Sequence, residues 1–168
     1  MTTTASGLQS LVLFRINDQR FALPLKSVER IIRAAAVTSV PETPPFVLGL
    51  INVNGQLVPV ISLRRCLGLA DHEILPEDQF VLARTSKMTM ALVVDEVQGL
   101  SELDVAQTTV PRDVLPGGGT RVHCMIKIKG DIILIYDLDK LFNLEEQDRI
   151  LASQDVILVG DGADIEAN

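Results

Sequence analysis

The clearest structural signal in the sequence is residues 45–64, PFVLGLINVNGQLVPVISLR. Its two apolar runs, Val47–Val53 and Leu57–Ile61, are separated by the connection Asn54-Gly55-Gln56. Asn and Gly readily adopt the left-handed backbone conformation that a tight turn between antiparallel strands requires. The stretch therefore predicts a β-hairpin, and this hairpin is the starting point for the rest of the chain.

Short apolar runs recur on both sides of the hairpin. Their enrichment in Val, Ile and Leu predicts further strands at Leu11–Ile16, Arg20–Leu23, Gln79–Arg84, Met88–Val94, Val122–Ile128 and Ile132–Tyr136. Strands this short, spaced by about ten residues, are typical of small barrels or sandwiches. Helices are few, and those predicted are Lys26–Arg33, Leu63–Leu67 after the N-cap residue Ser62, Leu138–Phe142 after the N-cap residue Asp137, and a helix from the N-cap residue Asn143 to Leu151.

An internal repeat relates the two halves of the chain. One shift along the sequence places Val28 on Val97, and a slightly longer shift places the helix cap Ser62 on Asp137. Because strands, turn glycines and caps agree together, we interpret the repeat as a duplication. The expected organisation is a flexible N-terminus over 1–9, one domain over 10–151 and an acidic, mobile tail over 152–168. The domain has halves at about 10–78 and 79–151, between which strands can be exchanged.

Composition narrows the class of function. The chain has 15 Lys and Arg against 22 Asp and Glu, and its net charge of −7 argues against nucleic acid or an anionic membrane surface as a partner. No apolar run approaches the ~20 residues of a membrane-spanning helix. The chain has only two histidines, and Cys66 and Cys124 have no metal-binding spacing, so we expect no metal, no cofactor and no catalysis. Asp95-Glu96 is interpreted as solvated surface.

The stretch 45–64 resembles the signature of the CheW family of chemotaxis coupling proteins, P-x-F-[IV]-x-G-[VL]-[IV]-N-[LV]-R-G-x-[IV]-[VI]-P-[VI]-[IV]-D-[LM]-R. The resemblance continues at Phe21–Leu25, Val94–Val97 and Gly130–Leu138, and it covers about residues 10–145. It implies an all-β fold with a few short helices, built as two small five-stranded SH3-like β-barrels with a hydrophobic seam between them.

The same resemblance implies an adaptor and not an enzyme. Members of the family bridge the cytoplasmic hairpin tip of a chemoreceptor to the regulatory domain of a CheA-type histidine kinase. The implied location is the cytoplasm, in receptor arrays beneath the inner membrane. No cofactor, nucleic acid or membrane insertion is implied.

The family's receptor groove, transferred position by position, implies a set of partner-binding residues. These are Val28, Arg30 and Ile31 on the first predicted helix, Gly49, Asn52, Val53, Asn54 and Gly55 around the hairpin, and Val97 and Leu100 from the second half. Simpler roles stay open, because Val28, Ile31 and Val97 also suit a plain core. The hairpin residues also suit a plain turn, and Gly49 and Gly55 suit special backbone conformations.

The sequence departs from the family signature at two positions. Asn54 stands where the family usually has Arg, and Asn lacks the charged planar fork of that residue. Ser62 replaces Asp, which is a mild change because both cap helices well. The first departure leaves open a coupler for another output, such as surface motility. From another class, a small-molecule-binding or hydrolytic β-barrel also stays open.

Overall fold

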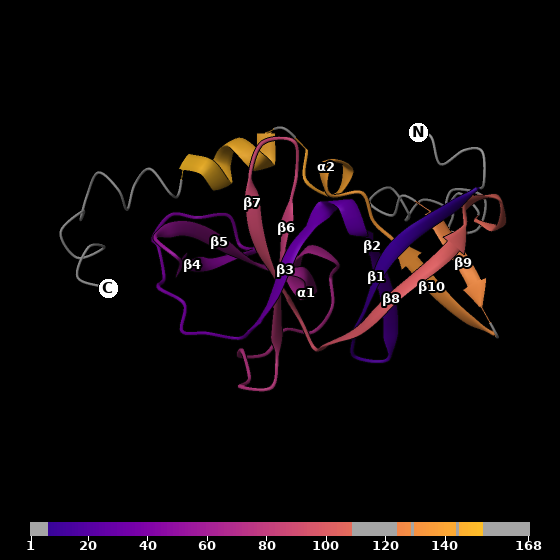
Figure 1. Ribbon diagram of the computed structural model, residues 1–168. Helices are drawn as coiled ribbons and strands as arrows, with labels where there is room; N and C mark the ends of the chain where they lie inside the picture. The colour runs from indigo at the N-terminus through magenta and orange to yellow at the C-terminus, as the bar shows by residue number, and fades with distance from the viewer. Residues whose placement is uncertain (1–6, 109–123, 129, 144, 153–168) are drawn as a thin grey trace.

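The structure is a computed structural model that describes residues 7–108, 124–128, 130–143 and 145–152. Within these ranges ten strands form two five-stranded sheets, which confirms the mostly β fold with two subdomains (Figure 1). In spatial order, the first sheet contains β8 (Glu96–Asp104), β1 (Leu8–Ile16), β2 (Gln19–Pro24), β10 (Asp131–Ile135) and β9 (Cys124–Ile128). The second contains β3 (Val28–Arg33), β6 (Gln79–Arg84), β7 (Thr89–Val94), β5 (Gln56–Ser62) and β4 (Val47–Val53).

Helical segments are short and lie between strands or after the last one. They are η2 (Leu25–Ser27), α1 (Leu63–Cys66), η3 (Val105–Gln107), α2 (Leu138–Leu141) and residues 145–152. The predicted caps are confirmed, because Ser62 Oγ and Asp137 Oδ1 each accept a backbone N–H from the first turn, at 3.2 and 3.0 Å. Asn143 and Glu146 accept each other's backbone N–H in a capping box. In the described ranges no helix has the length and apolarity to cross a membrane.

The strand registers confirm the duplication. Ala22 on β2 pairs in parallel with Ile135 on β10, and Ala91 on β7 pairs in parallel with Val60 on β5. The shorter sequence shift relates Ala22 to Ala91 and the longer one relates Val60 to Ile135, so both shifts recur as equivalent pairings. The edge strands are equivalent as well, because β3 pairs antiparallel with β6 just as β8 pairs antiparallel with β1. Each pair has a register irregularity, at Glu29 in β3 and at the equivalent residue Gln98 in β8.

Neither sheet comes from one half of the chain. The second sheet is continuous in sequence from β3 to β7, whereas the first combines β1 and β2 with β8, β9 and β10. The expected halves, 10–78 and 79–151, thus each give strands to both sheets. Asp95 alone connects β7 of the second sheet to β8 of the first. At the N-terminus, β1 begins at Leu8, inside the segment 1–9 for which we expect no fixed structure. Most of the expected tail lies outside the described residues.

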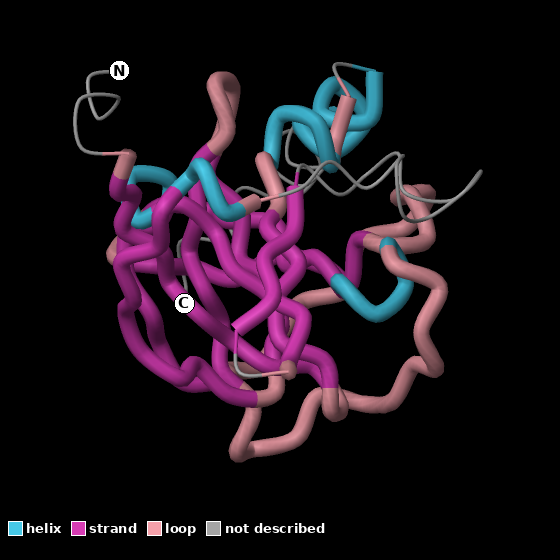
Figure 2. Tube along the Cα trace, turned by 90° about the vertical axis from the view of Figure 1, so that its right-hand side faces the viewer, coloured by secondary structure: helices cyan, strands magenta, loops and turns pink. Residues whose placement is uncertain are grey.

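The strands alternate their side chains between two hydrophobic layers. On β1, Leu11 and Leu13 lie in the core of the first sheet, while Phe14 and Ile16 join a larger core shared by both sheets. The second sheet has its own core, which contains Ile51, Val58, Val60, Phe80, Leu82 and Ala91. The shared core is the expected hydrophobic seam. Seen from the end of the molecule, the strands curve around a common centre and the helices lie mainly along one side (Figure 2).

One expectation of secondary structure is wrong, and one strand is missed. Residues 26–33 form the turn η2 followed by the edge strand β3, not a helix. The apolar spacing fits a helix, but the β-branched residues Val28 and Ile32 pair against β6, and an irregularity at Glu29 disguises the strand alternation. Strand β8 is not predicted at all, because it is largely polar and exposed and Gly99 interrupts it.

Candidate functional site

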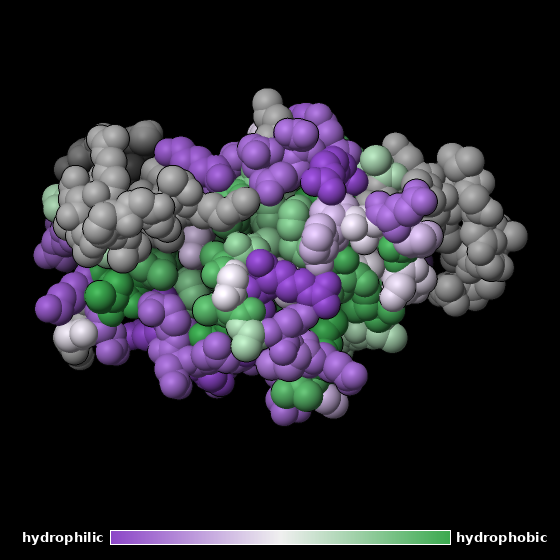
Figure 3. All heavy atoms as spheres, turned by 180° about the vertical axis from the view of Figure 1, so that it is seen from behind, coloured by the Kyte–Doolittle hydropathy of each residue, from purple (hydrophilic) through white to green (hydrophobic). Residues whose placement is uncertain are grey.

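The edge strands β3 and β8 present apolar side chains to solvent at equivalent positions. Ile31 on β3 is 38% exposed, and Leu100 on β8 is 65% exposed. The shift that relates Val28 to Val97 also relates these two residues, and each lies opposite a buried valine of the neighbouring strand, Val81 and Val12 respectively. Exposed apolar side chains that gather on one surface mark sites of interaction. On the side of the molecule opposite to Figure 1, apolar residues form separate groups among polar ones (Figure 3).

A second equivalent pair, Val28 and Val97, lies beneath this surface. Both side chains are half-buried and pack against the shared core. The two strands approach each other at the junction of the sheets, because the backbone N–H of Val97 donates to Gln79 Oε1 at 2.7 Å, and Gln79 pairs with Arg33 of β3. We call the surface of Val28, Ile31, Val97 and Leu100 the β3–β8 face. Arg30 lies on the same edge strand but pairs opposite Leu82, whereas Ile31 pairs opposite Val81, so strand alternation directs the Arg30 side chain to the other face of the second sheet. Val28, Arg30 and Ile31 all lie on a strand and not on the expected helix.

The other predicted residues lie on or beside the β4–β5 hairpin, and β4 is the edge of the second sheet opposite to β3. Asn54 and Gly55 form the turn with φ of 52° and 88°. The side chain of Asn52 is used within the turn, because its Oδ1 accepts the backbone N–H of Gly55 at 2.7 Å. Val53 is half-buried and packs against the core of the second sheet. Asn54 is exposed at the tip of the hairpin, and its side chain can therefore reach a partner.

Gly49 has a structural role beside the hairpin. Its φ is +150°, and a Cβ atom there would clash with the carbonyl oxygen of Thr38. Thr38 and Leu50 exchange two backbone hydrogen bonds of 2.9 and 2.8 Å, which join the segment after β3 to β4. This bridge links the two edges of the second sheet and closes it toward a barrel, and only glycine permits the close approach.

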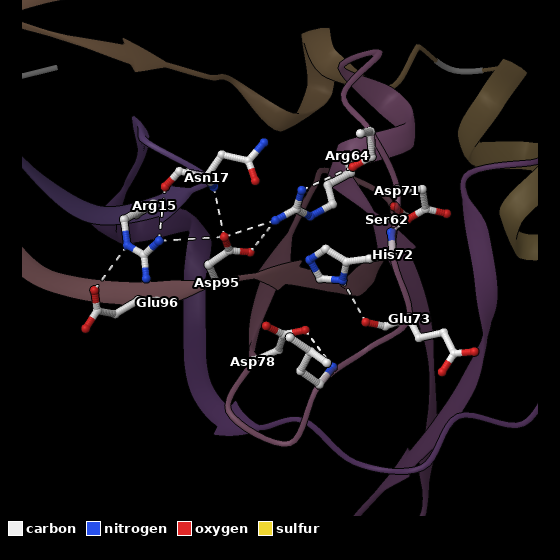
Figure 4. Close-up of polar contacts among 12 residues, drawn as sticks. Arg15, Asn17, Ser62, Arg64, Asp71, His72, Glu73, Asp78, Asp95 and Glu96 are labelled. Atoms are coloured by element: carbon white, nitrogen blue, oxygen red, sulfur yellow. Dashed lines mark hydrogen bonds and ion pairs between the residues drawn. The ribbon is translucent and has the colours of Figure 1, made fainter.

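Sequence reasoning missed an ion pair at the crossover between the sheets (Figure 4). Asp95 accepts from Arg64 Nη2 at both carboxylate oxygens, at 2.9 and 3.0 Å, and Arg64 is buried. Asp95 also accepts the backbone N–H of Asn17 in the β1–β2 turn at 2.8 Å, and its Oδ2 lies 3.7 Å from Arg15 Nη1 in a second ion pair. Asp95 is therefore a bridge between both sheets and not the solvated surface we expect. Its only sequence signal is a charged residue directly after the apolar run of β7, which does not identify a distant partner such as Arg64.

A groove of about 780 Å³ lies on the second sheet, between residues 34–39 and 71–76. Its ionisable residues include Arg65, Asp71 and His72. A hydrogen bond and ion pair with Arg65 lower the pKa of Asp71 below 3.8, while His72 Nδ1 lies 2.7 Å from the Glu73 carbonyl oxygen. These groups are tied to each other and to the backbone, which does not favour the hydrolytic alternative. Among the described residues, no three His, Cys, Asp or Glu side chains are grouped as metal ligands.

Two further ionisable side chains, Tyr136 and Cys66, lie in or against the shared core. Burial raises the pKa of Tyr136, in the shared core, to about 12. Cys66 is a half-buried thiol that packs against the same core. His123 and the side chain of Cys124 lie outside the described parts of the chain.

Comparison with known proteins gives a consistent result. The family model of the CheW-like domain matches residues 10–146. Chemotaxis protein CheW of Thermotoga maritima is 29% identical over 143 residues, 84% of this chain and 93% of the relative. Protein FrzA of Myxococcus xanthus is 32% identical over 108 residues, 64% of each chain. The crystal structure of scaffolding protein TtCheW from Thermoanaerobacter tengcongensis matches with a TM-score of 0.74 and 24% identity, over 82% of this chain and 94% of that chain, which supports the fold.

Proposed function

This chain belongs to the family of CheW-like domains, and from that premise we propose that it is a chemotaxis adaptor that couples chemoreceptors to a CheA-type histidine kinase. The observation that carries the proposal is the β3–β8 face. Two exposed apolar residues, Ile31 and Leu100, stand at equivalent positions above the shared core. An adaptor needs such a surface, because burial of apolar area is a main source of binding free energy between proteins.

We assign the receptor contact to the β3–β8 face. Ile31 and Leu100 supply the exposed contact area, and Val28 and Val97 form the apolar base below them. Arg30 is exposed and adds a charge at the edge. The β4–β5 hairpin contributes through Asn54, while Asn52, Val53, Gly49 and Gly55 maintain its shape.

The adaptor does no chemistry of its own in this proposal. By holding receptor and kinase together, it raises the effective concentration of one near the other. A conformational change of the receptor reaches the kinase only if it alters the adaptor's contact with both. The protein would work in the cytoplasm, clustered at receptor arrays beneath the inner membrane. A coupler for a different output remains the second candidate, favoured by Asn54 at the position where the family usually has Arg.

The test is calorimetric titration of the protein with two separate probes. One is the regulatory region of a CheA-type kinase, and the other is the helical hairpin tip of a chemoreceptor, both from the same organism. Binding to both supports the coupling role. Binding to the kinase alone contradicts the receptor contact, and binding to neither contradicts the adaptor function and returns attention to the groove on the second sheet.

A further inference from the structure

Most cations in the described parts of this acidic protein are paired, but those on and next to β3 are not. Ion pairs hold Arg15, Arg20, Arg64, Arg65, Arg84 and Lys87 to carboxylates. Among the described residues, four cations have neither an ion pair nor a side-chain hydrogen bond: Lys26, Arg30, Arg33 and Lys127. Three of these four lie within residues 26–33, and all three are exposed. The exposed β3 edge of the second sheet thus carries a cationic strip on a chain of net charge −7, with Arg33 on the face of Ile31 and Arg30 on the face opposite to it.

The duplicated strand β8 has the opposite character. The shift that relates Ile31 to Leu100 places Lys26 on Asp95, Arg30 on Gly99 and Arg33 on Glu102, so each cation of the strip corresponds to a neutral or acidic residue. The apolar residues of the β3–β8 face behave differently, because Val28 corresponds to Val97 and Ile31 to Leu100, whereas Ile32, which faces the core of the second sheet, corresponds to Ser101. The apolar part of the β3–β8 face is therefore nearly symmetric, and the charges are not.

The two strands run in opposite directions beside each other. At one end, Gln79 pairs with Arg33 of β3 and its side chain accepts from Val97 near the start of β8. At the other end, Leu11 of β1 pairs both with Pro24, just before η2 and β3, and with Ser101, near the end of β8. This arrangement is what a two-fold relation between the strands requires. The apolar residues alone would thus accept a helix in two orientations related by that symmetry.

We propose that the cationic strip of Lys26, Arg30 and Arg33 selects a partner helix with carboxylates along one flank of its apolar stripe, and that it restricts this helix to one of the two orientations. The proposal builds on the receptor-binding role proposed above and specifies the chemistry of that partner. Opposite charges across an interface fix orientation and suppress the wrong arrangement, since like charges would face each other in the reversed one. The acidic flank lies against β3, and Glu102 keeps it away from β8.

The test uses two designed amphipathic helical peptides that share one apolar stripe, with Glu on one flank in the first and Lys in the second. We expect the acidic peptide to bind the wild-type protein at least about tenfold more tightly at low salt, the size expected for three exposed ion pairs. The preference should reverse in K26E/R30E/R33E and shrink in high salt. The control variant K127E removes an equally unpaired cation on β9 and should keep the wild-type preference. Equal binding of both peptides, or no binding of either, overturns the proposal.

Orientation is read from a nitroxide placed at one end of the acidic peptide. In the wild-type protein, paramagnetic broadening should affect the amides at one end of β3 and spare the other. Broadening at both ends means that the helix binds in both orientations, which overturns the proposal. A receptor hairpin tip tested alongside separates the two hypotheses. If the acidic peptide binds selectively but the tip does not bind, the receptor role fails and the charge selection stands. If the tip binds wild type and K26E/R30E/R33E equally, the charge selection fails and the receptor role stands.

Discussion

Arg64 and Asp95 meet at the only residue through which the chain passes from β7 of the second sheet to β8 of the first. The guanidinium comes from α1, next to the second sheet, and the carboxylate also accepts the backbone N–H of Asn17 from the first. Arg64 further donates to the Ala70 carbonyl oxygen at 3.1 Å, in the loop that leads to the groove. One ion pair thus connects the crossover, a turn of the first sheet and a loop of the second.

Replacement of Asp95 by alanine is expected to lower the free energy of unfolding by about 2–4 kcal/mol, because it leaves the buried Arg64 guanidinium without a counter-charge. Urea unfolding followed by circular dichroism measures this. The matched control is E96Q, which removes the exposed partner of Arg15 and should cost less than about 1 kcal/mol. Similar losses for both variants would show that the crossover pair has no special role.

Gly49→Ala is expected to destabilise the second sheet by about 2 kcal/mol or more, because the new Cβ meets the Thr38 carbonyl oxygen and the φ of +150° is strained for alanine. Thermal unfolding of the wild type and of both variants measures this loss of stability. In the control Gly55→Ala, the φ of +88° is also unfavourable, but no atom lies within 4 Å of the added Cβ. If Gly49→Ala is no worse than this control, the close approach is not what requires glycine.

Ile31→Glu and Leu100→Glu are each expected to weaken binding of a receptor hairpin tip at least tenfold, because a charge then lies in the apolar part of the β3–β8 face. Both side chains are exposed, so the free energy of unfolding should change by less than about 0.5 kcal/mol. Calorimetric titration measures the affinity. Leu75→Glu, at a residue 42% exposed in the groove region, is the control. An equal loss in the control would mean that the effect is not specific to this face.

Asn54→Arg tests the departure from the family signature. An arginine at the hairpin tip offers the planar charged fork that the family usually carries, so affinity for a receptor tip with carboxylates or carbonyls there should rise several-fold. The turn should tolerate the change at a small cost, since Asn54 is exposed but has a φ of 52°. Unchanged affinity, measured by the same titration, would show that the hairpin tip is not a contact in this protein.

Asp139 gives a prediction about pH. Hydrogen bonds from the backbone N–H and the hydroxyl of Ser86, at 3.0 and 2.9 Å, lower the pKa of Asp139 below 3.8. The folded protein therefore keeps this carboxylate ionised where the unfolded chain already binds a proton. Its contribution to stability is present above pH 3.8 and is lost as the pH falls further. Asp139→Asn should flatten this part of the profile of urea unfolding against pH, and an unchanged slope would contradict the assignment.

The sequence predicts local structure well where a side chain accepts a hydrogen bond from a backbone N–H a few residues away. The hairpin turn at Asn54-Gly55 and the caps at Ser62, Asp137 and Asn143 depend on contacts within a few residues, and all are present. The duplication can also be predicted from the sequence. Ala22 and Ala91 are the same residue type, and each occupies the equivalent position in a parallel strand pair.

What the sequence does not predict depends on distant partners. Residues 26–33 fit a helix by spacing, and only pairing with β6 makes them a strand. Strand β8 does not show the alternation of apolar and polar residues that marks a strand, because most of its residues are polar. Only its equivalence to β3 in the duplication identifies it. For the same reason the sequence names Val28, Ile31, Val97 and Leu100 but not their common surface, and it gives no sign that Arg64 reaches Asp95.

The exchange of strands also determines the order in which this protein can fold during synthesis. The second sheet is complete once β7 has left the ribosome, because its strands are consecutive in the chain. Strands β1 and β2 are made first, yet their neighbours β8 and β10 follow only after β7, at Glu96–Asp104 and Asp131–Ile135. The first sheet must therefore form last, and the shared core remains open until then. A nascent chain released after β7 would carry a finished barrel and an unpaired hairpin, which is the form of this protein most exposed to aggregation and most in need of a chaperone.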